Sequence, residues 1–153
     1  MPAATPAHEL VVVPAAGQPA RTALLQQCFD TEIDDFEEDA THILLRLVPS
    51  LEPVGTIRCV KTKNYYKLSR LAVLRDHREH RFGRALVLAL HDHVKADAKI
   101  CGLAPSDTVS VISHSQIPVK GFYAKFGYVP EGEEFDEDGA PHQKMVARLS
   151  LSD

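Results

Sequence analysis

Four arginines stand at every third position in one short segment, at Arg75, Arg78, Arg81 and Arg84. Guanidinium groups match the oxygens of phosphate groups in both charge and geometry. Gly83 lies in the same segment and, having no side chain, would let a ligand come close to the backbone. The residue types and their spacing therefore predict a binding site for a polyphosphate.

The flanks of this segment indicate how the phosphate groups would be held. Residues 68–74 form an apolar run that predicts a strand, and apolar residues then recur every three to four positions up to Ala98, which predicts a helix. The first N–H groups of a helix have no acceptor within it, and the helix dipole adds positive charge there. The segment has neither the lysine-serine pair of a nucleotide P-loop nor the spaced glycines of a dinucleotide fingerprint.

Two motifs carry a resemblance to the GNAT superfamily of N-acetyltransferases. Arg78-x-x-Arg81-x-Gly83 resembles the Arg/Gln-x-x-Gly-x-Gly/Ala turn that holds the pyrophosphate of acetyl-CoA, with Arg81 in place of the first glycine. Downstream, Gly121-Phe-Tyr-Ala-Lys-Phe-Gly-Tyr-Val-Pro130 is similar to the family's Phe-Tyr-x-x-x-Gly-Phe signature. The two motifs occur in the family's order.

Two further segments resemble the ElaA-like and YjcF-like branch of that superfamily. Residues 133–145 are similar to its Glu-x-Gly-Ile-Pro-His-x-x-Met tail, and residues 37–42 resemble its acidic run ending in Ala-x-His. The resemblance covers roughly residues 20–149.

The expected fold class is α/β, more exactly an α+β arrangement with a mixed, mostly antiparallel sheet flanked by helices. The resemblance implies that the parallel strands 68–74 and 108–113 splay apart to hold the cofactor. Periodicity and turn residues predict further strands at 9–14, 42–48, 54–62 and 143–149, helices at 20–29 and from Pro118 to Phe126, and loops at 33–39, 49–53 and 102–107.

By resemblance the cofactor is acetyl-CoA. The backbone of Leu71, Ala72 and Val73 would hold its acetyl and pantetheine end, and the N–H of Val73 would stabilise the oxyanion. Further cofactor contacts are expected from Arg78, Glu79, His80, Arg81, Phe82, Gly83, Arg84, Ala85, Gln116 and Tyr123.

Tyr123 is the expected catalytic acid, because its place in the motif would let its phenol protonate the leaving thiolate. An alkyl ammonium titrates at about 10, so a base must first deprotonate the acceptor amine. The serines and the arginine on the predicted cofactor strands are not basic enough for this task. The candidate bases are His42, His114 and His142, and a carboxylate acting through water is equally possible.

Two acidic clusters, each with six acids in eight residues, lie at 32–39 and 131–138. They favour a cationic acceptor such as an amino sugar, polyamine, amino acid or aminoglycoside, and the tail motif suggests that Asp136, Glu137 and His142 contact it. Three other interpretations stay open: a lysine-bearing peptide as acceptor, an acyl-CoA sensor without turnover, and nucleic-acid binding by the arginine segment.

Composition limits these alternatives. The chain has 153 residues, the length of a single domain, with ends at 1–8 and 150–153 that we expect to be flexible. Its net charge of -4 argues against nucleic acid and anionic membranes as partners. Three cysteines without metal-type spacing predict buried free thiols and no metal. The sequence also has no long apolar run, and together these features indicate a cytoplasmic or nuclear protein. A homodimer is common in the resembling families.

Overall fold

A computed structural model describes residues 5–13 and 40–152. In these residues eight strands form one sheet in the order β1-β2-β3-β4-β5-β8-β6, with β7 on β8. The elements are β1 (His8–Val13), β2 (Thr41–Leu47), β3 (Pro53–Lys61), β4 (Tyr66–Val73), the 3-10 helix η1 (Arg75–His80), α2 (Phe82–Ile100), β5 (Thr108–Gln116), the 3-10 turn η2 (Ile117–Val119), α3 (Lys120–Ala124), β6 (Val129–Pro130), β7 (Phe135–Glu137) and β8 (Ala140–Ser150).

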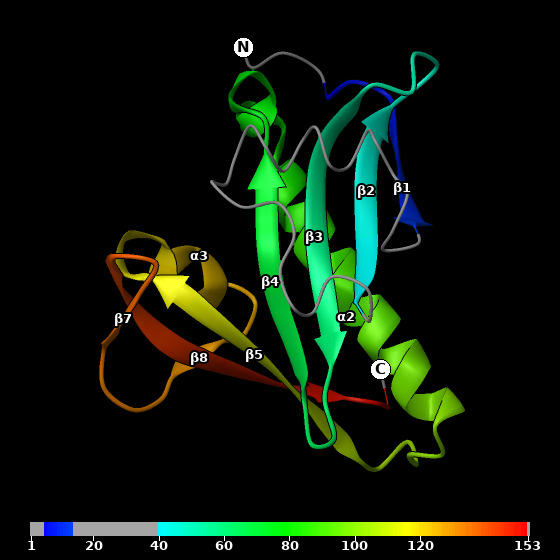
Figure 1. Ribbon diagram of the computed structural model, residues 1–153. Coiled ribbons are helices and arrows are strands. Elements are labelled where there is room, and N and C mark those ends of the chain that lie inside the picture. Colours follow the sequence, from blue (N-terminus) through cyan, green and yellow to red (C-terminus); the bar gives the residue numbers. More distant parts are fainter. Residues whose placement is uncertain (1–4, 14–39, 153) are drawn as a thin grey trace. The chain divides into compact units, whose positions relative to one another are not determined.

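The chain divides into two compact units, Met1–Val60 with Arg70–Leu90, and Lys61–Ser69 with His91–Asp153. In the first unit β1 and β3 pair antiparallel with the two sides of β2, as Figure 1 shows. The start of α2 packs against this sheet, because a Cβ on Gly55 of β3 would lie only 3.0 Å from Leu86 Cδ1. Glycine at this position permits the close approach of helix and strand.

The length of α2 follows from its apolar spacing. Phe82, Leu86, Leu90, Val94 and Ala98 are all buried, and each lies four residues after the one before it. This spacing repeats one face of an α-helix. The helix ends at Ile100 and is followed by Gly102, whose φ of 100° suits glycine.

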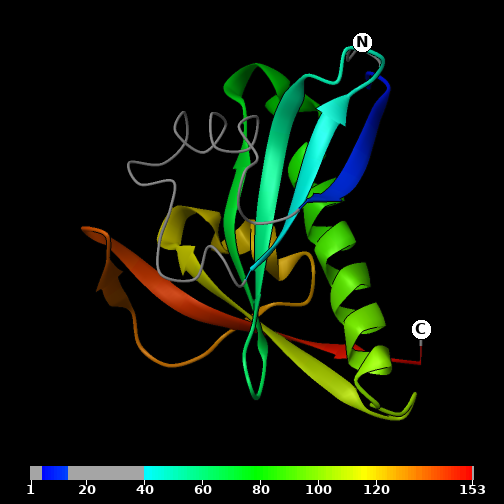
Figure 2. The ribbon, with the colours of Figure 1, turned by 45° about the vertical axis from the view of Figure 1, so that its right-hand side comes forward.

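In the second unit β5 is paired on both sides. It runs parallel to β4 from Tyr66↔Val111 to Leu68↔Ser113, which confirms the predicted parallel neighbours. Its other side pairs antiparallel with β8 along its whole length, from Thr108↔Ser150 to Gln116↔His142, and Figure 2 shows this long pair. The short strands β6 and β7 pair with β8.

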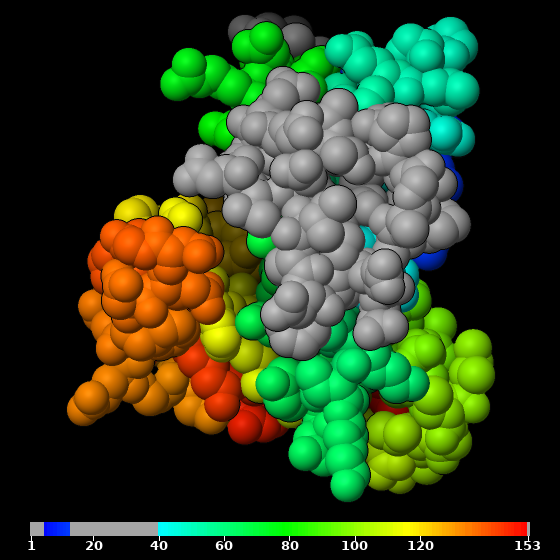
Figure 3. Space-filling view, in the orientation of Figure 1, coloured from blue at the N-terminus to red at the C-terminus, as the bar shows by residue number. Residues whose placement is uncertain are grey.

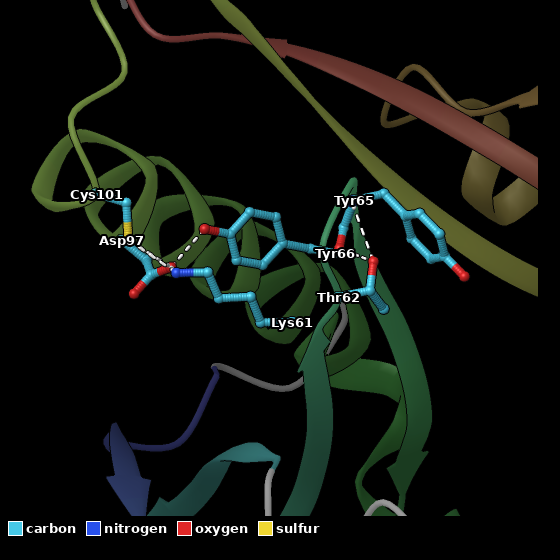
Figure 4. Close-up of polar contacts among 6 residues, drawn as sticks. All are labelled: Lys61, Thr62, Tyr65, Tyr66, Asp97 and Cys101. Atoms are coloured by element: carbon cyan, nitrogen blue, oxygen red, sulfur yellow. Dashed lines mark hydrogen bonds and ion pairs between the residues drawn. The ribbon is translucent and has the colours of Figure 1, made fainter.

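A polar cluster joins the turn between β3 and β4 to the last turns of α2, all within the second unit (Figure 4). Asp97 Oδ2 lies 2.8 Å from Lys61 Nζ and also accepts a hydrogen bond from the Tyr66 hydroxyl. Burial alone would raise the pKa of Asp97, but these two hydrogen bonds and the charge of Lys61 outweigh it and lower that pKa. Thr62 closes the turn itself, since its hydroxyl donates to the Tyr65 carbonyl at 2.7 Å.

Several predicted elements need correction. The segment 75–80 is a 3-10 helix rather than an open turn, β5 extends three residues past Ser113, and the helix expected to begin at Pro118 starts as a 3-10 turn and ends at Ala124. The strands β6 and β7 were not predicted, because two or three residues are too short for a periodic signal. Cys101 is exposed although we expected a buried thiol, while Cys59 is buried as predicted. The predicted helix 20–29, the acidic loop 33–39 and Cys28 lie outside the described residues.

Candidate functional site

The arginine segment ends at Arg81, which stands where the resembling motif has its first glycine, and the backbone conformation of Arg81 is one that glycine adopts easily. After η1, Arg81 has φ 59° and ψ 31°, the left-handed region, and α2 begins at the next residue. Glycine adopts this conformation without the steric cost that a Cβ brings. The N–H of Ala85 bonds the Arg81 carbonyl at 3.2 Å, so Arg81 is the first residue whose carbonyl accepts within the helix. The N–H groups of residues 82–84 therefore belong to the first turn, which can bind anions.

Arg78 connects this turn to the end of β4. Its Nε donates to the carbonyl of Val73 at 2.9 Å, within the first unit. A guanidinium has five N–H donors, so this bond occupies only one of them. The side chains of Arg78, Arg81 and Arg84 are all exposed. The donor set of the turn, a helix start with three arginines, fits a polyphosphate.

Within β4 the backbone is irregular just before the residues expected to hold pantetheine. Arg70 has φ 53°, a value that a regular strand does not have. A left-handed residue inside a strand redirects the next residues, as a β-bulge does. Leu71, Ala72 and Val73 follow directly, and Ala72 and Val73 are buried. The splaying of β4 from β5 stays a prediction.

Tyr123 is the one buried residue of α3, with 8% of its surface exposed. Burial raises the pKa of its phenol, and a hydrogen bond with the Ser113 hydroxyl lowers that pKa in part. A phenol with an ordinary or raised pKa is protonated at neutral pH, as a proton donor requires. From the sequence we considered the strand serines only as bases, so the contact of Ser113 with Tyr123 was not predicted.

Tyr128, a buried tyrosine shortly after α3, has a different role. The Tyr128 hydroxyl lies 2.8 Å from Nε2 of His91 on α2. Burial, followed by the charge of Lys95, lowers the pKa of His91 to about 4, so the ring is neutral at physiological pH. This pair anchors the chain after α3 to the second half of α2, within the second unit.

A histidine-carboxylate cluster lies between β5 and the hairpin of β7 and β8. His114 Nδ1 lies 3.0 Å from Glu137 Oε1, and His142 Nε2 lies 3.9 Å from Glu137 Oε2. The Phe135 ring packs against both imidazoles, with ring centroids 5.0 Å from His114 and 6.2 Å from His142. Two of the three candidate bases are therefore brought together by one carboxylate. The hairpin that carries Glu137 forms part of the surface shown in orange in Figure 3.

Strand geometry places this cluster and Tyr123 on opposite faces of the β5–β8 pair. Successive side chains of a strand point to opposite faces. Ser113 contacts Tyr123, so its neighbour His114 points to the other face. His142 lies opposite Gln116, two residues after His114, and therefore shares the face of His114.

The remaining predicted site residues lie elsewhere. His42 is buried on β2 in the first unit, with 1% of its surface exposed. Gln116 is exposed at the end of β5, and Asp136 is exposed on β7 opposite Pro141. In the described part of the chain no group of three metal-ligating side chains occurs, and no helix combines the length and apolarity needed to span a bilayer.

Comparison with known proteins supports the same interpretation. A family model described as an acetyltransferase (GNAT) domain matches residues 12–149. The uncharacterized N-acetyltransferase YjcF of Bacillus subtilis is 32% identical over 118 residues, which are 76% of this chain and 76% of that protein. A candidate N-acetyltransferase from Lactobacillus plantarum superposes with a TM-score of 0.74 at 25% identity, over 94% of this chain and 99% of that chain.

A more distant solved structure agrees in fold alone. The GNAT family N-acetyltransferase YhbS of Escherichia coli, solved in complex with CoA, has a TM-score of 0.69 at 17% identity. The match covers 98% of this chain and 86% of that chain. The fold class and the superfamily expected from the sequence are confirmed.

Proposed function

The chain belongs to the GNAT family of acetyltransferases, and on that premise we propose that it transfers the acetyl group of acetyl-CoA directly to the primary amine of a small cationic molecule. The observation that carries the proposal is the buried Tyr123 phenol, which contacts Ser113 of β5. Acetyl-CoA, when bound, supplies an activated thioester that an amine can attack.

The arginine turn and the end of β4 hold the cofactor in this proposal. The first N–H groups of α2 bind the pyrophosphate, and the exposed guanidinium groups of Arg78, Arg81 and Arg84 add positive charge. The backbone of Leu71, Ala72 and Val73 binds the pantetheine and acetyl end. The CoA complex of the related fold supports acyl-CoA as ligand.

Direct acetyl transfer needs two proton transfers. A base removes one proton from the acceptor ammonium, and the amine nitrogen then forms a bond to the acetyl carbonyl carbon. The carbon-sulfur bond breaks with its electron pair on sulfur, and Tyr123 donates a proton to that sulfur. The amine nitrogen releases its second proton to water and Tyr123 regains one from water, so that one proton is released for each acetyl group transferred.

Surface charge around β7 supports a cationic acceptor. Of the six acids in 131–138, Glu131 pairs with Lys144 at 3.2 Å and Glu137 pairs with His114 at 3.0 Å. The other four are exposed, namely Glu133, Glu134, Asp136 and Asp138. Their combined field would attract an amine.

Calorimetric titration of acetyl-CoA into the protein tests the cofactor site. We expect binding that Arg84→Ala weakens about tenfold, because one charge-assisted contact to phosphate is lost. Arg148→Ala is the matched control, since Arg148 is an exposed arginine of β8 outside the proposed site, and it should leave the affinity unchanged. Absence of binding at millimolar acetyl-CoA would overturn the proposal.

A panel of amines then tests the acceptor class. We propose glucosamine, spermidine, lysine and kanamycin, together with an acetylated peptide that contains one free lysine side chain, and CoA release as the readout. Turnover of a small amine supports the proposal, and turnover of the peptide alone would make the protein a lysine acetyltransferase. Binding of acetyl-CoA without turnover of any acceptor would favour the sensor, the alternative suggested by Arg81 in the turn. The cytoplasmic location and a homodimer stay predictions.

A further inference from the structure

We propose that His114 is the general base of this reaction and that Glu137 is a positioning residue, which directs the lone pair of His114 rather than binding the acceptor. The inference rests on the proposed function, because it assigns a residue to its proton-removal step. It selects one of three candidate histidines and gives Glu137 a different role from the one expected from the sequence.

The contact with Glu137 decides which nitrogen of His114 carries a proton. His114 Nδ1 lies 3.0 Å from Glu137 Oε1, and a carboxylate oxygen can only accept a hydrogen bond. Nδ1 is therefore the donor. In the neutral ring the lone pair is then on Nε2, the nitrogen that faces away from Glu137. His114 Nε2 is thus the atom that can take a proton from an acceptor ammonium.

His142 is held differently and is less accessible. Its Nδ1 donates to the Ala140 carbonyl at 2.9 Å, and its Nε2 is directed toward Glu137 at 3.9 Å. Only 8% of the His142 side chain is exposed, against 28% for His114. His142 therefore has neither nitrogen directed to an incoming amine.

Both oxygens of Glu137 are directed at histidine rings. Oε1 contacts His114 at 3.0 Å, and Oε2 lies 3.9 Å from His142 Nε2. The edge of the Phe135 ring, inclined by 78° to the His114 imidazole, limits rotation of that imidazole from another side. The arrangement holds one base in one orientation, as the carboxylate of a catalytic triad does for its histidine.

The separation of His114 from Tyr123 is consistent with the two residues acting on different atoms. In a direct transfer the amine attacks the carbonyl and the thiolate departs, so the base and the acid act on different atoms. Tyr123 lies on the Ser113 face of β5, and His114 points to the opposite face. In this proposal the base reaches the amine from one face of β5 and the acid reaches the sulfur from the other.

Nitrogen NMR of the histidine side chains tests the geometry without needing an acceptor. At a pH where the ring is neutral, we expect His114 to show the tautomer protonated on Nδ1, with the resonance assigned by its loss in His114→Gln. Glu137→Ala should abolish this preference, and Glu134→Ala, which removes an exposed acid just before β7, should leave it intact. A wild-type ring protonated on Nε2 would overturn the inference while leaving acetyl-CoA binding and the proposed function untouched.

Steady-state kinetics with the fastest amine of the panel separates positioning from binding. If Glu137 orients the base, Glu137→Ala lowers kcat about tenfold or more and changes the KM for the amine little. His114→Gln lowers kcat at least as much, about 100-fold. A raised KM with unchanged kcat in Glu137→Ala would show an acceptor contact and overturn the positioning role. An unchanged kcat in His114→Gln would overturn the base assignment although acetyl transfer itself remained.

Discussion

Ser113 and His114 are consecutive residues of β5 whose side chains lie on opposite faces of the β5–β8 pair, one against Tyr123 and the other against Glu137. Strand alternation alone produces this separation. A single dipeptide thereby connects the proposed acid on α3 with the proposed base and its carboxylate on β7. If the two residues were exchanged, the imidazole would point to the Tyr123 face, away from Glu137.

Tyr123→Phe should remove the proton donor without leaving a cavity in the core. Phenylalanine preserves the ring, so we expect kcat to fall about 100-fold while the affinity for acetyl-CoA changes less than about threefold. Tyr128→Phe is the matched control, because it deletes another buried hydroxyl in the same segment, one that contacts His91. Rates measured by CoA release check the prediction. Equal rates in wild type and Tyr123→Phe would exclude the phenol from the mechanism.

Arg81→Gly should relieve the left-handed backbone that begins α2. Arg81 has φ 59°, which costs a residue with a Cβ about 1 to 2 kcal/mol, partly offset by the greater unfolded-state entropy of glycine. We expect stability against urea to rise by up to about 1 kcal/mol. Leu51→Gly, at an exposed position with φ 66°, should give a similar gain.

The same pair of variants shows what the arginine side chain contributes to cofactor binding. If Arg81 adds a cation to the phosphate site, Arg81→Gly weakens acetyl-CoA binding although it stabilises the fold, and Leu51→Gly leaves the affinity unchanged. Tighter binding in Arg81→Gly would mean that the side chain obstructs the turn.

His91 should make the protein less stable in mild acid. Burial lowers the pKa of His91 to about 4, below its ordinary value of 6.5, so the unfolded chain binds the proton more readily. The contribution is fully present above the unfolded value and is lost as the pH falls from 6.5 toward 4. At pH 4 the lost stability is on the order of 2 kcal/mol after allowance for partial exposure.

Urea unfolding from pH 7 to pH 4 checks this expectation. His91→Gln keeps a polar side chain near the Tyr128 hydroxyl but cannot titrate in this range, so its stability should depend less on pH than that of the wild type. Parallel pH profiles of the two proteins would contradict the prediction.

Asp97→Asn should loosen the connection between α2 and the turn of β3 and β4. Asp97 pairs with Lys61 and accepts from the buried Tyr66. Loss of its charge should lower the free energy of unfolding by only about 1 kcal/mol, because Lys61 is partly exposed. The lowered pKa of Asp97 means that this contribution exists above the ordinary carboxyl range and disappears as the pH falls through the folded value. Asp92→Asn, an exposed acid of the same helix, is the control. Equal unfolding midpoints for the two variants would contradict the prediction.

The sequence by itself determined the features that depend on local spacing. Apolar residues every three to four positions placed α2, runs of apolar and β-branched residues placed β2, β3 and β4, and two motifs in a fixed order indicated the superfamily. These features are predictable because each depends on residues a few positions apart. The same spacing could not predict β7, which at three residues forms a strand only by pairing with β8.

Only the tertiary structure decided how the candidate catalytic residues combine. From the sequence His42, His114 and His142 were equivalent, and Glu137 was one of six acids in a row of eight residues. Pairing of β5 and β7 with β8 brings His114 next to Glu137, a residue 23 positions away, and leaves His42 buried on β2 in the other unit. The physical reason is that the partner of a polar side chain is chosen by strand register and facing direction, which arise from long-range pairing and leave no trace in local composition.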